Sequence, residues 1–265
     1  MYACISRNLL WNKLQSAGIN VDSIFFRALQ GVYDNVKCSV KVNGRLTDWF
    51  NVTNGLKQGC LLSPILFNIY INDLVTLIKE SCTGISIAGE NVCLLMYADD
   101  LVLLARNEKG LQCMLDILHQ WCMEWKININ TDKSEVIHFR KGCVNRSNVS
   151  FRVGENHLKT VSQYKYLGLY LDEHLNFKVI ADHVAKSANR ALSLIIAKAK
   201  ACGGVPFNCF KKLYESAVVP VVHYGSVVWG MSQFSSINNV HHKACSYFLG
   251  VRKTTPNAAT QGDMG

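Results

Sequence analysis

At residues 93–105 the chain reads Cys93-Leu94-Leu95-Met96-Tyr97-Ala98-Asp99-Asp100-Leu101-Val102-Leu103-Leu104-Ala105, an apolar run interrupted by two adjacent aspartates. The apolar residues on each side suffice for one short buried strand, which leaves Ala98 and the aspartates for the turn. Neighbouring carboxylates repel each other, and burying either beside apolar walls without a partner is costly. The stretch therefore predicts a hairpin with a carboxylate pair at its tip, where a cation compensates the charge.

The carboxylate pair matches the coordination chemistry of magnesium. Mg²⁺ keeps several waters and binds through one or two carboxylates together with substrate phosphates. Asp99 and Asp100 are therefore candidate metal ligands. A second interpretation stays open, because Asp is common in turns and the pair could belong to an ordinary surface β-turn.

The composition combines a sizeable core with a positive surface. The 265 residues include 28 Lys and Arg against 19 Asp and Glu, a formal charge of +9, and 49% are hydrophobic. A folded basic protein favours nucleic acid or an acidic membrane surface as its partner, and a ribosomal-type binding protein would look similar. No apolar run reaches the roughly 18 residues of a membrane span, so no membrane partner is expected.

The eleven cysteines do not indicate a disulfide framework. Their number is odd, the chain is long, and no secretory leader with a charged start and an apolar core opens it. Reduced thiols are therefore expected, in the nucleus or the cytoplasm. No Cys-x-x-Cys pair is present, so no zinc knuckle is predicted.

Hydrophobic spacing and capping residues predict an α+β fold in which an antiparallel sheet packs on helices. Asn43-Gly44 is the strongest hairpin signal, and Ser63-Pro64 reads as a cap followed by Pro at the first helical position. The predicted helices cover residues 6–18, 21–33, 63–79, 108–125, 179–200, 207–219 and 234–249. The predicted strands cover residues 36–42, 45–52, 85–88, 134–140, 150–153 and 164–171.

The character of the chain changes beyond about residue 176, where helical spacing and basic residues dominate. These basic residues could bind a duplex backbone, or they could form an ordinary solvated face, and both interpretations stay open. They are Lys178, Lys186, Arg190, Lys198, Lys200, Lys211 and Lys212.

A second constellation reads Gly55-Leu56-Lys57-Gln58-Gly59-Cys60-Leu61-Leu62-Ser63-Pro64 and leads into a predicted helix. Two glycines let the backbone approach another molecule closely, and the amide of Gln58 offers both a donor and an acceptor. Together with Tyr97-Ala98-Asp99-Asp100, this loop resembles the palm of LINE-type, non-LTR retrotransposon reverse transcriptases, with the motifs in the family's order. Weaker similarities to the same family lie at residues 8–14, 42–44, 130–135, 164–168 and 213–230.

The resemblance implies RNA-templated DNA synthesis by two-metal phosphoryl transfer, with an RNA template, a DNA primer, deoxynucleoside triphosphates and Mg²⁺ or Mn²⁺. It implies a palm over residues 1–172, a helical thumb-like module over 173–253 and a flexible tail over 254–265. The implied roles are metal binding for Asp99 and Asp100, assistance to the leaving pyrophosphate for Lys133, a primer grip at Tyr166, Leu167 and Gly168, and contacts to template base, nucleotide or sugar for Tyr2, Gln58, Gly59, Ser63, Tyr97 and Ala98.

The chain departs from the family pattern at its start. The family's first metal-binding aspartate would precede Met1, and Ala3 stands where the motif has its last aspartate. The fingers, an endonuclease domain and a zinc knuckle are also not found. Since a two-metal site depends on its charges, we expect a partial reverse transcriptase with little or no polymerase activity by itself.

Other classes remain as alternatives. A decayed or domesticated remnant would bind nucleic acid without chemistry. A viral RNA-dependent RNA polymerase shares the palm but usually has Gly where this chain has Ala98. A group II intron-type enzyme is closer, although the long helical region at the end fits the retrotransposon type better.

Overall fold

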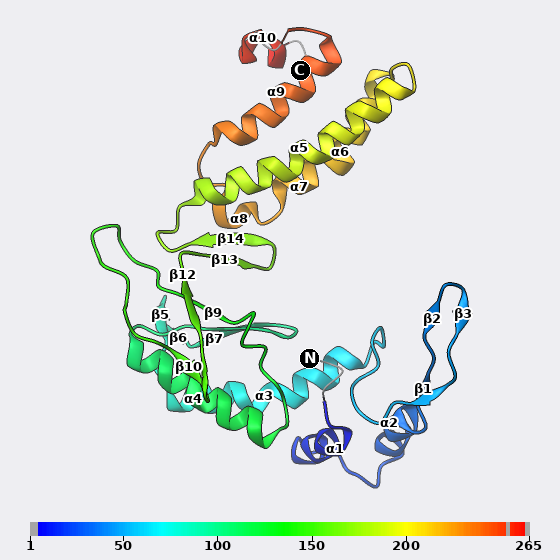
Figure 1. Cartoon of the computed structure of the whole chain (residues 1–265), viewed down its shortest axis with the longest axis vertical. Helices are drawn as coiled ribbons and strands as arrows, with labels where there is room; N and C mark the ends of the chain where they lie inside the picture. The colour runs from blue at the N-terminus through cyan, green and yellow to red at the C-terminus, as the bar shows by residue number, and fades with distance from the viewer. Residues whose placement is uncertain (1–4, 253–254, 263–265) are drawn as a thin grey trace. The chain divides into compact units, whose positions relative to one another are not determined.

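The computed structural model describes residues 5–252 and 255–262 (Figure 1). Tyr2 and Ala3, which were aligned with the family's first motif, lie outside this part of the chain. The chain divides into two compact units. Unit 1 holds Met1–Glu135 and Asn148–Lys159, and unit 2 holds Val136–Ser147 and Thr160–Gly265.

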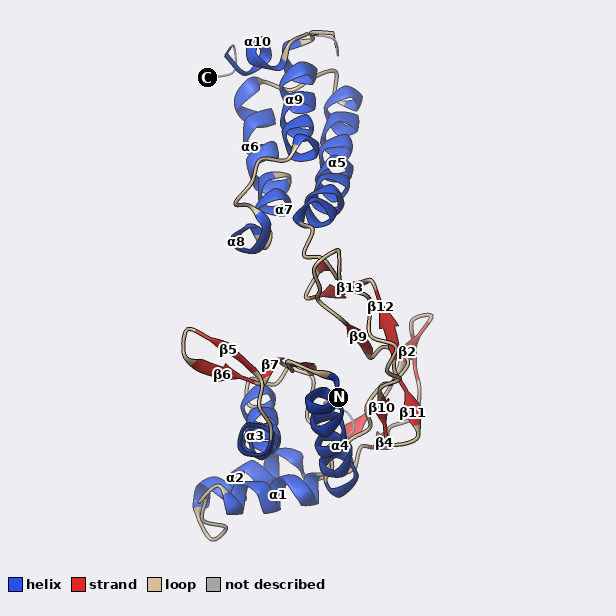
Figure 2. Ribbon diagram, turned by 90° about the vertical axis from the view of Figure 1, so that its left-hand side faces the viewer, coloured by secondary structure: helices blue, strands red, loops and turns tan. Residues whose placement is uncertain are grey.

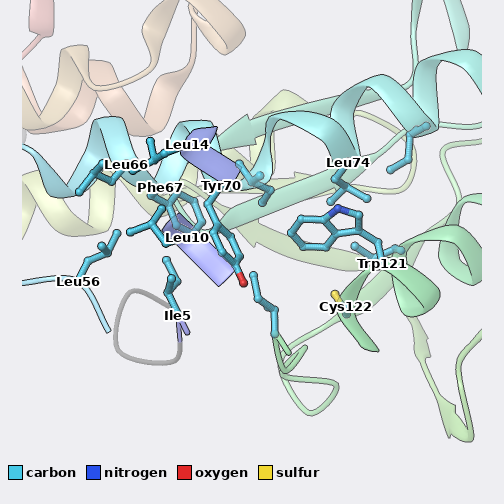
Figure 3. Packing of buried hydrophobic residues seen from close by; sticks show 14 of the residues in the cluster. Ile5, Leu10, Leu14, Leu56, Leu66, Phe67, Tyr70, Leu74, Trp121 and Cys122 are labelled. Atoms are coloured by element: carbon cyan, nitrogen blue, oxygen red, sulfur yellow. The ribbon is translucent and has the colours of Figure 1, made fainter. Parts of the chain in front are cut away.

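Unit 1 is built on four helices that bury a common apolar core. They are α1 (Arg7–Ser16), α2 (Ile24–Tyr33), α3 (Ser63–Ser81) and α4 (Glu108–Glu124). Figure 3 shows Leu10 and Leu14 of α1 beside Phe67 and Tyr70 of α3, with Trp121 of α4 near the other end of the cluster. Each fully buried side chain of this size contributes about 1.5–3 kcal/mol, so this core holds the helices in place.

The strands of unit 1 form short antiparallel hairpins. Asn43 (φ 50°) and Gly44 (φ 84°) make the predicted tight turn, which needs positive φ at both positions. The pairs are β1 (Lys37–Cys38) with β4 (Phe50–Asn51), β2 (Lys41–Val42) with β3 (Arg45–Leu46), β5 (Ile85–Ile87) with β6 (Glu90–Val92), β7 (Leu94–Tyr97) with β8 (Asp100–Leu103), and β10 (Arg152–Val153) with β11 (Asn156–His157).

Unit 2 combines a hairpin with a group of helices (Figure 2). The long helix α5 (Phe177–Ala201) buries Ala188 and Leu192 against Phe210 and Val240, which lie on two other helices. Unit 2 holds most of β9 (Glu135–Ile137), which pairs with β12 (Lys159–Val161), and all of β13 (Gln163–Tyr166), which pairs with β14 (Leu169–Asp172). The remaining helices are α6 (Phe207–Ala217), α7 (Val219–His223), α8 (Ser226–Trp229), α9 (Ser235–Leu249) and α10 (Asn257–Gly262).

The α+β class is confirmed, but the strands in the described ranges pair two by two instead of joining one sheet. Most of these strands are two to four residues long and are closed by tight turns, so their hydrogen bonds stay within each hairpin. Five short elements were not predicted, because each is too short to show a period: β6, β11, β12, α7 and α8. Across the part of the chain that is described, no helix is both long and apolar enough to cross a bilayer.

Two helix starts and the end of the chain differ from the sequence expectation. α2 begins at Ile24 because the Ser23 side chain accepts a hydrogen bond from Phe26 N and caps it there. Ser63 was expected to be a cap, yet it is the first helical residue and Leu62 is the N-cap. The segment 254–265, for which the sequence predicted a flexible tail, contains α10, and Thr260 Oγ1 lies 2.9 Å from His242 Nδ1.

Candidate active site

The predicted aspartate hairpin is confirmed. β7 and β8 pair antiparallel with Tyr97 opposite Asp100, so Ala98 and Asp99 form a two-residue turn. Ala98 has a positive φ of 51°, a backbone conformation that a residue with a Cβ adopts only at some cost. The register therefore fixes the turn, and it sets both carboxylates at the tip.

The two faces of this hairpin have different surroundings. Met96 and Leu101, which are partners in the register, pack against the core of unit 1. Because side chains alternate along a strand, Tyr97 and Asp100 lie on the opposite face, and Tyr97 is 65% exposed. The expectation of apolar walls around the pair is wrong: both Asp99 and Asp100 are exposed, since only one face of the hairpin is covered.

The glutamine loop folds into a β-turn over residues 57–60. Cys60 N donates to Lys57 O at 3.2 Å. Gly59, at the third position, has a φ of 83°, which a type II turn requires there and which favours glycine. Gln58 is exposed at the corner of this turn, so its amide is available to a ligand while the backbone is held.

Ser63 holds the glutamine turn through a hydrogen bond to its backbone. Its hydroxyl donates to Lys57 O at 2.6 Å and lies 3.4 Å from the Tyr33 hydroxyl. The residue is 4% exposed. Ser63 therefore fixes the shape of the turn, and its role in binding the template base or the nucleotide stays a prediction.

Arg7 is a structural partner of the same loop that the sequence analysis missed. Its guanidinium donates to Gly55 O at 3.1 Å, to Tyr33 O at 2.9 Å and to Asn54 O at 3.4 Å. It also lies 5.4 Å from the centroid of the Tyr33 ring. Its partners are distant in sequence, so no local pattern could have revealed this clamp between α1, α2 and the glutamine loop.

A buried lysine links α1 to α3 in the core of unit 1. Lys13 of α1 is 6% exposed and pairs with Asp73 of α3, and its Nζ lies 3.4 Å from the centroid of the Trp125 ring. Trp121 Nε1 donates to Asp73 Oδ1 at 3.1 Å. Burial lowers the pKa of Lys13, and the carboxylate of Asp73 opposes that shift. Burial likewise raises the pKa of Tyr70, whose hydroxyl donates to Trp125 O, to about 12.

Lys133 lies on a different turn of unit 1. Its backbone N donates to Asn130 O at 3.2 Å, and its side chain is exposed. This turn chemistry accounts for the backbone at residues 130–134. The role in pyrophosphate release stays a prediction.

The predicted primer-grip residues form the turn of the β13–β14 hairpin in unit 2. Tyr166 is opposite Leu169, and Leu167 (φ 46°) and Gly168 (φ 87°) make the two-residue turn. The Tyr224 hydroxyl donates to Leu167 O at 2.6 Å. A Cβ at Gly168 would lie 3.1 Å from the Tyr224 ring, so the ring would have to shift slightly to accept a larger residue, and the positive φ also favours glycine.

The donor set at the aspartate hairpin fits a hard divalent cation. Asp99 and Asp100 supply two exposed carboxylates on a rigid turn, and a magnesium-type ion completes its shell with water and phosphate oxygens. Within the described ranges no group of three or more His, Cys, Asp or Glu side chains could hold a metal by itself. The protein therefore offers a partial shell that a substrate would complete.

Residues 2–171 match the family model of reverse transcriptases, the RNA-dependent DNA polymerases. This match covers more than half of the chain and includes both the glutamine turn and the aspartate hairpin. The chain belongs to the reverse transcriptase family. Members of this family use divalent metal ions, a nucleic-acid template and nucleotide substrates.

Several relatives are named as RNA-directed DNA polymerases or Pol polyproteins of mobile elements. The chain is 25% identical over 209 residues to the RNA-directed DNA polymerase from mobile element jockey of Drosophila melanogaster, covering 76% of this chain and 22% of the relative. It is 24% identical over 221 residues to the jockey polymerase of Drosophila funebris, covering 81% and 24%. It is 32% identical over 153 residues to the Pol polyprotein from the retrotransposable element R2DM of Drosophila melanogaster, covering 55% and 14%.

The chain spans about a quarter or less of the length of these relatives. The resemblance to non-LTR retrotransposon reverse transcriptases is confirmed at the level of the family.

Proposed function

We propose that the chain supplies the nucleotidyl-transfer site of a non-LTR retrotransposon reverse transcriptase, acting inside the cell in the nucleus or the cytoplasm. The substrates are an RNA template, a DNA primer and deoxynucleoside triphosphates. The observation that carries this proposal is the exposed Asp99-Asp100 pair at the tip of the β7–β8 turn, in a chain that belongs to this family. Residues 1–172 correspond to a palm in this proposal, and the helices of residues 173–253 correspond to a thumb-like module.

The residues of the hairpin divide the work between binding and positioning. Asp99 and Asp100 hold Mg²⁺, which when bound activates the primer hydroxyl and stabilises charge on the triphosphate. Tyr97 and Ala98 hold the turn toward the nucleotide. The pairing of β7 with β8 fixes the position of both carboxylates. Pre-organised charge of this kind is usually the largest single contribution to catalysis.

The glutamine turn positions the template side of the site. Gln58 offers its exposed amide, and Gly59 leaves open space above the backbone, with nothing within 4 Å of a Cβ built there. Arg7 and Ser63 act through the turn as positioning residues. Their hydrogen bonds to Gly55 O and Lys57 O limit how far the loop can move when a nucleic acid binds.

Binding of a metal ion is the most direct test of the site. Activity is a weaker test, because we expect little nucleotide incorporation by this chain alone when only two carboxylates are available to the metal. Mn²⁺ is titrated into the full chain with and without a deoxynucleoside triphosphate, and bound Mn²⁺ is read by electron paramagnetic resonance. We expect Asp99→Asn and Asp100→Asn to weaken Mn²⁺ binding at least tenfold. Asp48→Asn, an exposed carboxylate between β3 and β4 of unit 1, is the matched control and should change nothing.

A primer-extension assay on an RNA template, with Mg²⁺ or Mn²⁺, accompanies the titration. Any incorporation should disappear with Asp99→Asn and persist with Asp48→Asn. Equal Mn²⁺ affinity in the Asp99 and Asp48 variants would contradict the assignment of the site. Robust extension by the chain alone would contradict the expectation of low activity.

The second candidate function is binding of nucleic acid without chemistry. It is favoured by the net charge of +9 and by the basic residues of α5. Under this function Asp99→Ala leaves nucleic-acid affinity unchanged, and no variant of the hairpin alters Mn²⁺ binding.

A further inference from the structure

Two cysteine thiols lie against each other at the place where α3 ends and packs on α4. Cys82 is the C-cap residue of α3, and Cys113 lies in the first half of α4. Their Sγ atoms are 3.6 Å apart, although 31 positions separate the two residues in the sequence. Both are free thiols, and both belong to unit 1. A disulfide has an S–S length of about 2.05 Å, so a shift of about 1.5 Å between the two sulfurs would be enough to form one.

The two thiols differ in their access to solvent. Cys113 is exposed, whereas Cys82 is buried. Burial, together with the hydrogen bond that the Cys82 thiol donates to Cys113 Sγ, raises the pKa of Cys82 to about 11. Since the thiolate is the form of cysteine that reacts with oxidants, Cys82 is protected while its partner is reduced. A dissolved oxidant therefore meets Cys113 first, and Cys82 is already in place as the second thiol.

A third cysteine nearby is held in a different way. Cys93 is 1% exposed, and its thiol donates to Cys82 O at 3.4 Å and accepts from Asn91 Nδ2 at 3.3 Å. Gly84 N donates to Asn91 Oδ1 at 2.9 Å, so the same asparagine links Cys93 to the backbone that follows α3. Cys93 is thus part of a buried hydrogen-bonded cluster and is not accessible to an oxidant. The geometry selects Cys82 and Cys113 as the reactive pair.

The pair lies at the base of the segment that carries the aspartate turn. Residues 83–112, between the two cysteines, contain the β5–β6 and β7–β8 hairpins and both Asp99 and Asp100. A bond between the cysteines would close this segment into a covalent loop whose ends are fixed at α3 and α4. A cross-link of this kind restricts the unfolded chain and typically stabilises the folded one.

We propose that Cys82 and Cys113 form a reversible oxidation site, at which hydrogen peroxide produces a disulfide that anchors the aspartate segment to α3 and α4. Redox-sensing cysteines are typically solvent-accessible and lie next to a second thiol that resolves the first oxidation product, as Cys113 and Cys82 do. The inference needs only these two thiols, so it does not rest on the proposed function.

The reaction takes two steps. The Cys113 thiolate attacks one oxygen of the peroxide, so that an S–O bond forms, the O–O bond breaks, and the leaving hydroxide takes up a proton as water. The Cys82 sulfur then attacks the sulfur of this sulfenic acid, so that the S–S bond forms, the S–O bond breaks, and hydroxide leaves as water with the Cys82 proton. The two thiols lose two electrons, and one peroxide is reduced to two waters. A dithiol reductant reverses the bond by thiol–disulfide exchange.

Peptide mapping of the full chain tests the bond directly. The chain is treated with about two equivalents of hydrogen peroxide, its free thiols are blocked with N-ethylmaleimide, and a tryptic digest is analysed by mass spectrometry without reduction. Trypsin leaves Cys82 in peptide 80–106 and Cys113 in peptide 110–126. We expect these two peptides to be cross-linked after peroxide and separate after dithiothreitol. Each peptide contains one further cysteine, so fragment ions have to identify the linked pair.

Three variants separate the steps of the reaction. Cys113→Ser should remove the cross-link. Cys82→Ser leaves the first oxidation product without its partner, so sulfenic acid should accumulate at Cys113 and be trapped by dimedone. Cys38→Ser removes an exposed thiol of β1 in the same unit and is the matched control, which should cross-link as the parent does. Because Cys113 is exposed, Cys113→Ser should fold normally, and it keeps the test decisive even if Cys82→Ser does not fold.

Thermal unfolding tests whether the bond anchors the segment. The oxidised parent should unfold at a temperature about 5–10 °C higher than the reduced parent. Amide hydrogen exchange within residues 83–112 should slow at the same time. Peroxide should change neither measurement in Cys113→Ser.

Three results would overturn the proposal. The first is a main product in which Cys82 is linked to Cys93, or in which two chains are linked, seen as a dimer on a non-reducing gel. The second is a cross-link that forms only after the chain has been unfolded in urea. The third is an equal unfolding temperature for the oxidised and reduced parent. Asp99→Asn should form the bond normally, so the inference and the proposed function fail on different measurements.

Discussion

The turn at Ala98-Asp99 and the turn at Leu167-Gly168 each join two strands of four residues, yet their tips have different surroundings. The first tip carries two exposed carboxylates, with Tyr97 exposed beside them. At the second tip Leu167 and Gly168 are also exposed, but the Tyr224 hydroxyl donates to Leu167 O. One tip exposes two carboxylates, and the other is held by a contact to a distant segment of its own unit.

A substitution has a different cost at each turn. A larger residue at Gly168 has to shift the Tyr224 ring, so it should destabilise unit 2. A substitution at the aspartate turn displaces nothing from the core, so it should act on ligand binding while stability changes little. Surface changes away from special features are usually within ±0.5 kcal/mol.

Gly168→Ala is expected to have the largest effect. Alanine at a φ of 87° is strained, and its Cβ would lie 3.1 Å from the Tyr224 ring. Together these costs should lower the free energy of unfolding by about 2–3 kcal/mol, measured by urea denaturation with circular dichroism.

Gly59→Ala is the matched control for the steric part. Gly59 has a similar φ of 83°, but nothing lies within 4 Å of its Cβ. It should cost only about 1 kcal/mol, the backbone term. Equal losses in the two variants would mean that Tyr224 does not constrain the β13–β14 turn.

Glu173, which follows β14, makes the stability of unit 2 depend on pH. Its buried carboxylate accepts from Arg146 Nη2 at 2.8 Å and pairs with Arg140 Nη2 at 3.1 Å. The hydrogen bond from Arg146, with that from Arg140 and the two positive charges, lowers the pKa of Glu173 from 4.5 to about 2, although desolvation opposes the shift.

Since the folded pKa is below the unfolded one, this contribution to stability is complete above pH 4.5 and is lost as the pH falls toward 2. Thermal unfolding between pH 6 and pH 2.5 should show the loss, and Glu173→Gln should be less stable at pH 6 and flatter in this window. Glu135→Gln, an exposed carboxylate on β9, should behave as the parent does. A parent and a Glu173 variant with parallel pH profiles would show that the arginines do not stabilise unit 2 through this carboxylate.

Local chemistry made much of this architecture predictable. Asn43-Gly44 and the aspartate run each indicated a hairpin, because turn residues and flanking apolar residues lie within a few positions of each other. The long helices were predictable for the same reason, since their buried residues repeat at helical spacing, as Ala188, Leu192 and Ile195 do in α5.

What was not predictable depends on partners far along the chain. The clamp from Arg7 to Gly55 spans 48 positions, and the bond from Tyr224 to Leu167 spans 57. The burial of the aspartate hairpin was overestimated because the apolar run covers both faces of the strands, yet Leu95 is 47% exposed. The roles of the site residues came from the resemblance to a family, since periodicity carries no information on chemistry.

Ala98→Gly should have the smallest effect on stability. It tests most directly whether the exposed tip makes packing contacts. Glycine removes the cost of a Cβ at a φ of 51°, about 1 kcal/mol, but it also adds flexibility to the unfolded chain, which offsets much of that gain. The free energy of unfolding should therefore rise by a few tenths of a kcal/mol at most. Ala88→Gly, in the β5–β6 turn with a φ of 50°, is the matched control and should shift stability equally.

The two alanine variants should separate only when metal is added. Ala98 directly precedes the carboxylate pair, so a more flexible glycine there should weaken Mn²⁺ binding two- to threefold, while Ala88→Gly leaves it unchanged. A loss of more than about 1 kcal/mol in Ala98→Gly alone would show that the methyl group is packed. The aspartate turn would then be held by contacts within its unit, as the Leu167-Gly168 turn is, and the difference between the two turns would not hold.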